Sequence, residues 1–102
     1  MDEKKSTTTQ FLKNRDEWIR KVVNDPTLSH TTARVAVHIA MRLRSDQRFC
    51  WPSIDKIAEE TGISRRAVST ALDKLCDKDW RLVLRQSRPN VGNMYSLNFP
   101  WL

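Results

Sequence analysis

Glycine and proline are both scarce in this chain of 102 residues, which holds only two glycines and four prolines. So few glycines exclude a glycine-rich phosphate loop and a β-sandwich built on glycine turns. No apolar run approaches the ~20 residues that a membrane span requires, and the first residues lack the apolar segment of a signal peptide. These absences favour a small cytoplasmic protein with no membrane partner.

Cysteine and histidine are equally scarce, with two residues of each. In a cytoplasmic protein Cys50 and Cys76 are expected to remain free thiols that pack as small apolar residues. His30 and His38 are not at a spacing familiar from metal sites. No hydrolase, metalloprotease or nucleotide-binding motif is present. We therefore expect no enzyme activity, metal, cofactor or small-molecule ligand.

What the chain does have is positive charge on a globular composition. It carries 18 Lys and Arg against 12 Asp and Glu, a net charge of +6, with 39% apolar residues. That apolar share is enough for a single folded domain and too high for a disordered chain. The basic balance favours a polyanion as partner.

The first quarter of the chain divides into two parts. Residues 1–9 are polar and are interpreted as a flexible arm. Residues 10–25 have apolar residues at helical spacings, which predicts an amphipathic helix. The apolar residues of this segment are Phe11, Leu12, Trp18, Ile19, Val22 and Val23.

The next segment, 29–44, is predicted to form the central helix. Ser29 is a suitable N-cap residue for it. Its apolar residues surround most of the helix, and a helix of this kind is buried from more than one side.

Two short elements with serine caps follow. Residues 53–60 and 64–78 are predicted helices, with Ser53 and Ser64 as N-caps and Gly62 in the turn between them. This spacing predicts a helix-turn-helix. Its small core is expected to consist of Ile57, Ala58, Ile63, Val68 and Leu72.

The C-terminal quarter is predicted to form a β-hairpin, or wing, over residues 81–98. Short strands at 82–84 and 94–97 are separated by a turn-rich stretch at 86–93. The apolar tail at 99–102 is expected to fold back on the domain. The fold class is therefore mainly α with a small β-hairpin, and residues 10–102 form one domain.

The second helix of the helix-turn-helix has a polar outer face. At about 100° per residue, Arg66 and Thr70 lie on that face, Ser69 lies on its flank and Arg65 at its shoulder. Arginine can form a fork of hydrogen bonds to guanine or phosphate, and hydroxyls can contact either. With the polar residues of the hairpin, the predicted DNA-binding set is Ser64, Arg65, Arg66, Ser69, Thr70, Arg85, Arg88 and Asn90.

Acidic residues are expected to lie away from this set. Residues 61–72 and 80–102 contain arginine but no acid, so positive charge gathers where helix and hairpin would meet a phosphate backbone. Further backbone contacts are expected from the excess charge of the first half, at Arg34, Arg42, Lys4 or Lys5. The acids held apart are Asp55, Glu59, Glu60, Asp73, Asp77 and Asp79.

Several short stretches together carry a resemblance to a known family. They are Trp51-Pro52-Ser53, Ile57-Ala58, residues 61–68, Ala71-Leu72, Leu75 and residues 93–97. On these residues, 28–97 resembles the winged helix-turn-helix domains of bacterial and phage or plasmid regulators and replication proteins. The resemblance implies that 64–75 is the recognition helix, that the hairpin contacts phosphate or the minor groove, and that the protein acts at the bacterial nucleoid. Asp79 departs from the glycine usual in that family.

These observations lead to a first hypothesis of sequence-specific binding to double-stranded DNA by a transcriptional regulator acting as a repressor. One alternative is a replication or plasmid-maintenance protein that binds origin repeats. Another is a winged helix used for protein–protein assembly without DNA. A homodimer is expected on a palindromic site. The apolar face of residues 11–23 would either form the dimer contact or pack on its own domain.

Overall fold

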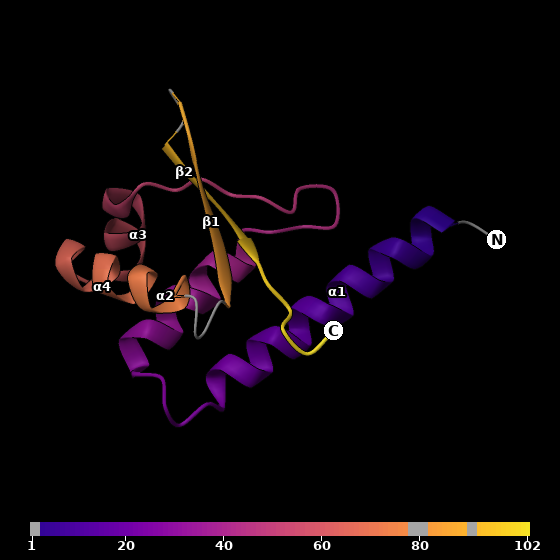
Figure 1. Ribbon diagram of the computed structural model, residues 1–102, viewed down its shortest axis with the longest axis horizontal. Coiled ribbons are helices and arrows are strands. Elements are labelled where there is room, and N and C mark those ends of the chain that lie inside the picture. Colours follow the sequence, from indigo (N-terminus) through magenta and orange to yellow (C-terminus); the bar gives the residue numbers. More distant parts are fainter. Residues whose placement is uncertain (1–2, 78–81, 90–91) are drawn as a thin grey trace.

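Four helices precede a two-stranded antiparallel hairpin (Figure 1). The computed structural model describes the backbone of residues 3–77, 82–89 and 92–102, and the side chains from residue 9 onward within those ranges. This architecture confirms the predicted fold class, mainly helical with an N-terminal helix before the helix-turn-helix. The elements are α1 (Glu3–Val23), α2 (His30–Met41), α3 (Ile54–Thr61), α4 (Arg65–Leu75), β1 (Val83–Arg88) and β2 (Gly92–Leu97).

The first helix starts earlier than the sequence pattern predicted. α1 begins at Glu3, so most of the expected polar arm at 1–9 is helical. Residues 3–9 contain neither glycine nor proline, and a helix already formed extends at low cost through such a segment. In Figure 1 the N-terminal part of α1 projects beyond the other elements. None of the helices in the described ranges combines the length and apolarity needed to cross a bilayer.

The apolar face of α1 packs on its own domain, which was one of the two alternatives for it. Phe11, Trp18 and Val22 are buried in the common core. The Trp18 Nε1–H donates to the carbonyl oxygens of Leu82 and Asn98, each at 3.1 Å. α1 is thereby attached to the chain on both sides of the hairpin's base.

α2 occupies the centre, as its nearly continuous apolar surface predicted. It packs against α1, α3, α4 and β2. Ser29 caps it, with Oγ accepting from the Thr32 N–H at 3.0 Å. The helix ends at Met41 rather than at residue 44, because Arg44 pairs with Gln47 in a tight turn.

The helix-turn-helix forms from local signals. Ser53 caps α3 by accepting from the Lys56 N–H at 3.0 Å. Gly62 ends it in the left-handed region at φ +73°, and its N–H donates to the Ala58 carbonyl at 2.9 Å. A Cβ at Gly62 would meet nothing within 4 Å, so the backbone conformation rather than space requires glycine. α4 ends at Leu75, and residue 78, the predicted end, lies outside the described residues.

The hairpin strands are longer than predicted. β1 and β2 pair from Val83 opposite Leu97 to Arg88 opposite Gly92, so much of the expected turn at 86–93 is strand. Backbone hydrogen bonds continue the ladder through polar residues whose side chains are solvated on both faces. Asn90, Asp79 and Trp80 lie outside the described residues.

Two further segments connect the hairpin to the domain. Cys50 exchanges backbone hydrogen bonds with Tyr95, at 3.0 and 2.7 Å, forming a single bridge. The chain end folds back as expected: Phe99 and Trp101 pack edge-to-face at 5.9 Å between ring centroids, and the Lys21 ammonium lies 4.9 Å from the Trp101 ring centre. Figure 1 shows the C-terminus beside α1.

Candidate nucleic-acid interface

One face of α4 is packed against the rest of the domain, and its first turn is capped. Ser64 caps it, its Oγ accepting from the Ala67 N–H at 3.2 Å. This cap fixes the first turn, and the apolar stripe fixes the helix rotation, so the opposite face is presented to solvent. The buried side chains are Val68, Ala71, Leu72 and Leu75.

Arg66 and Thr70 form one exposed edge of α4, where the helical projection placed them. Also exposed on this helix are Arg65, Asp73 and Lys74. The Thr70 Oγ1–H donates to the Arg66 carbonyl at 3.0 Å, which leaves the hydroxyl oxygen able to accept. Among the described residues, the Arg66 guanidinium has no hydrogen-bond or ion-pair partner. Ser69 is half-buried on the flank. On this edge, the Arg66 guanidinium is therefore available to bind a ligand and lies one helical turn from the Thr70 hydroxyl.

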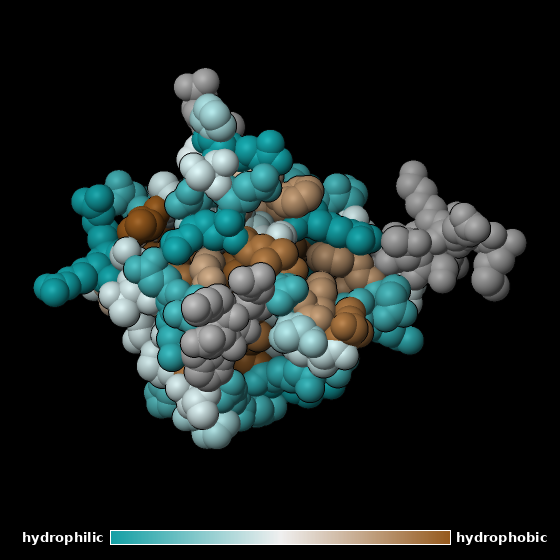
Figure 2. Space-filling model, viewed as in Figure 1, coloured by the Kyte–Doolittle hydropathy of each residue, from teal (hydrophilic) through white to brown (hydrophobic). Residues whose placement is uncertain are grey.

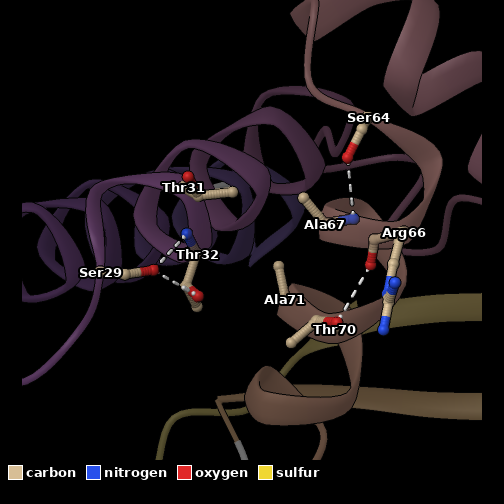
Figure 3. Close-up of a pocket in the computed structure, with 8 residues that line it drawn as sticks. All are labelled: Ser29, Thr31, Thr32, Ser64, Arg66, Ala67, Thr70 and Ala71. Carbon is tan, nitrogen blue, oxygen red and sulfur yellow. Dashed lines mark hydrogen bonds between the residues drawn. The ribbon is translucent and has the colours of Figure 1, made fainter.

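A hollow of about 390 Å³ separates this edge from the start of α2. Figure 3 shows hydroxyl-bearing residues of α2 facing α4 across it. Thr32 is buried and bonded to Ser29, whereas Thr31 is half-buried. The sequence identified Ser29 as a cap but not as a neighbour of α4, because only the packing of α2 on α4 brings them together. The hollow is lined by Ser29, Thr31, Thr32, Ser64, Arg66, Ala67, Thr70 and Ala71.

Arg65 differs from Arg66 in having an acidic neighbour. Its Nε forms an ion pair with Oδ1 of Asp55, which lies in the first turn of α3. Both side chains are largely exposed, 75% for Arg65 and 69% for Asp55. The expectation that acids stay away from the start of this helix is therefore wrong, because the packing of α3 against α4 places Asp55 there.

The same correction applies to the hairpin. Arg85 on β1 donates from Nη2 to Oδ1 of Asp73 on α4, at 3.2 Å. Its side chain is only 33% exposed, so it connects the hairpin to α4. Arg88 is exposed, with its Nη2 3.5 Å from Oε1 of Gln86 on the same strand. Of the arginines predicted to bind DNA, two are therefore paired with carboxylates.

A second hollow, of about 300 Å³, joins the helix-turn-helix to the hairpin. It has the Arg65–Asp55 pair on one side and Asn93 and Tyr95 of β2 on another. The DNA-binding set predicted from the sequence did not include Asn93. Figure 2 shows a projecting hairpin that is mostly hydrophilic above a surface with apolar residues near its centre.

Two arginines expected to contact the nucleic acid backbone also bond to residues of α3. Arg34 donates from Nη2 to the Thr61 carbonyl at 2.8 Å, and Arg42 pairs with Glu60. Glu60 also contacts His38, with 3.1 Å between Oε1 and Nε2. The hydrogen bond from Arg42 lowers the pKa of Glu60, and burial lowers the pKa of His38. These contacts therefore stabilise the packing of α2 on α3, and the contribution of Arg34 and Arg42 to DNA binding stays a prediction.

The two cysteines are free, and they belong to the core rather than to the interface. Cys50 is buried, and burial raises the pKa of its thiol to about 11. Burial also raises the pKa of Cys76. Both thiols are therefore protonated near neutral pH and poorly reactive.

Comparison with known families gives one finding. A profile described as a helix-turn-helix domain matches residues 27–80, which include α2, α3 and α4. Comparison with curated proteins gives no match, and comparison with solved structures gives none. The match covers the elements that present Arg66 and Thr70, and the hairpin that follows them completes a winged arrangement.

Proposed function

Because this chain belongs to the helix-turn-helix domain family, whose members bind DNA, we propose that it recognises a specific sequence of double-stranded DNA. The observation that carries the proposal is the exposed edge of α4. There Arg66 has no partner among the described residues, and Thr70 lies one turn further along a helix that is anchored from behind.

The geometry supports a specific mode of reading. The major groove, about 12 Å wide, admits an α-helix. With α4 in it, the Arg66 fork can donate to O6 and N7 of a guanine, and the Thr70 hydroxyl can bond to an adjacent base edge or phosphate. Ser29 and Thr31 line the hollow across from this edge and would face the sugar–phosphate strand that borders the groove. Arg88 on the hairpin would contact phosphate.

We further propose that this binding represses transcription. A domain bound within a promoter excludes polymerase from the same DNA, so repression needs no activity other than occupation of the site. A single small domain covers limited DNA surface, and a homodimer on two half-sites would extend the contact.

Enrichment of random-sequence DNA on the purified chain tests the proposal. We expect one sequence to be enriched, and the double variant Arg66→Ala, Thr70→Ala to lose it, with affinity for that duplex falling by at least tenfold. Arg20→Ala, which removes an exposed arginine from α1, is the matched control and should bind as the parent does.

The same experiment separates the alternatives. Footprints on genomic DNA at one palindrome in a promoter support the repressor, whereas repeated sites at an origin favour a replication role. An inverted repeat with half-sites one helical turn apart supports the dimer, and a single half-site bound by a monomer contradicts it. If the double variant binds DNA with the parent's affinity and salt dependence, the DNA-reading proposal is wrong and an assembly role gains support.

A further inference from the structure

Two carboxylates contact arginines of the interface, and they do so at different nitrogen atoms. Asp55 on α3 is paired with Nε of Arg65, the first residue of α4. Asp73 on α4 accepts a hydrogen bond from the terminal Nη2 of Arg85 on β1. This difference matters because the terminal nitrogens of arginine form the fork that reads guanine.

Arg65 keeps that fork available. The guanidinium has five N–H donors, of which Nε carries one. None of the terminal nitrogens of Arg65 is hydrogen-bonded to any residue that the structure describes, and the side chain is 75% exposed. Asp55 thus holds the inner end of a guanidinium whose outer end is open to solvent.

Arg85 shows the opposite arrangement. Asp73 occupies one of its terminal nitrogens, and the side chain is only 33% exposed at the base of the hairpin. This hydrogen bond and the partial burial restrict how the fork of Arg85 can approach DNA. Arg85 is therefore a structural link between β1 and α4.

We propose that Asp55 is a positioning residue for sequence discrimination, holding Arg65 so that its terminal nitrogens reach a base edge. The inference rests on the proposed reading of duplex DNA by α4. Residues at the start of a recognition helix contact base edges, and Arg65 is the first residue of α4. A long side chain loses rotamer freedom when it binds, and prior orientation reduces that loss. The carboxylate also repels phosphate, so it weakens attachment of Arg65 to DNA of arbitrary sequence.

The test measures discrimination, defined as the ratio of affinities for the enriched duplex and for a shuffled duplex of the same composition. We expect Asp55→Ala to lower it by about 3- to 10-fold. Asp55→Asn keeps an oxygen that can accept a hydrogen bond from Nε of Arg65, so this variant should retain part of the discrimination. Asp46→Ala, which removes an exposed carboxylate paired with Nε of Arg44 outside the predicted DNA-binding set, is the matched control and should change the ratio by less than about twofold. Thermal unfolding of each variant verifies that the fold is intact.

A double-mutant cycle locates the effect. Arg65→Ala should lose the same discrimination, and adding Asp55→Ala to it should cause no further loss. If Asp55→Ala and Asp55→Asn strengthen binding to both duplexes equally with an unchanged ratio, Asp55 only repels phosphate and the positioning role is wrong. If the parent chain itself does not discriminate, the proposed function fails and this inference fails with it.

Discussion

α4 and the hairpin each carry two of the arginines predicted to bind DNA, but they are supported differently. α4 buries four side chains and has a capped first turn. β1 buries only Val83 of its six residues and is otherwise solvated. A rigid helix can hold donors against particular base edges, whereas an arm anchored at its base is suited to phosphate, whose position depends little on sequence. The difference indicates that α4 reads the base sequence and that the hairpin positions the domain on the phosphate backbone.

The largest expected difference between the two regions is in stability. Leu72→Ala, at a fully packed position of α4, should lower the free energy of unfolding by about 2–5 kcal/mol. Leu84→Ala on β1, where the side chain is 42% exposed, should change it by less than about 0.5 kcal/mol. Urea unfolding followed by circular dichroism measures both, and comparable losses would contradict the contrast in anchoring.

The next difference concerns DNA. Arg66→Ala should cost about 1–3 kcal/mol of binding to the preferred duplex and relax its sequence preference. Arg88→Ala on the hairpin should weaken binding to all duplexes alike and reduce the salt slope of log K by about 1. Fluorescence anisotropy at several salt concentrations distinguishes them. A change in sequence preference caused by Arg88→Ala would show that the hairpin also reads bases.

The smallest difference is between the two glycines, both at positive φ, +73° for Gly62 and +94° for Gly92. Neither position lacks space for a Cβ, so alanine adds conformational strain of about 1–2 kcal/mol at either site. Gly62→Ala should lower global stability by about this amount, because the turn connects α3 and α4, which pack against each other. Gly92→Ala should lower it less, since the end of a two-stranded hairpin can open locally. Thermal denaturation compares the two, and an equal loss would show that the hairpin unfolds only with the whole domain.

The parts of the fold that the sequence predicted correctly depend on short-range chemistry. Ser29, Ser53 and Ser64 were identified as caps because a hydroxyl before an apolar repeat satisfies an N–H within the next turn. Gly62 was identified as the turn because glycine readily adopts the left-handed conformation that ends a helix. Two of the missed boundaries, at the start of α1 and in the hairpin strands, lie in polar segments where no apolar period marks the element. The third, the end of α2, depended on the turn between Arg44 and Gln47.

The candidate site divides in the same way. The exposure of Arg66 and Thr70 followed from the helical period alone, and their role in DNA binding stays a prediction. The partners of Arg65 and Arg85 did not follow, because Asp55 is ten residues from Arg65 and Asp73 is twelve residues from Arg85 along the chain. Which charges meet across such separations depends on how the elements cross.

By itself, the sequence determined the helical caps, the turn at Gly62, the apolar face of α4 and therefore the polar edge that α4 presents. Each of these depends on residues within one or two turns, where covalent geometry sets the spacing. Only the tertiary structure decided that Thr31 and Arg66 line the same hollow, that Asp55 pairs with Arg65 and that Asp73 pairs with Arg85. Contacts of that kind depend on the packing of whole helices and strands, which no local pattern encodes.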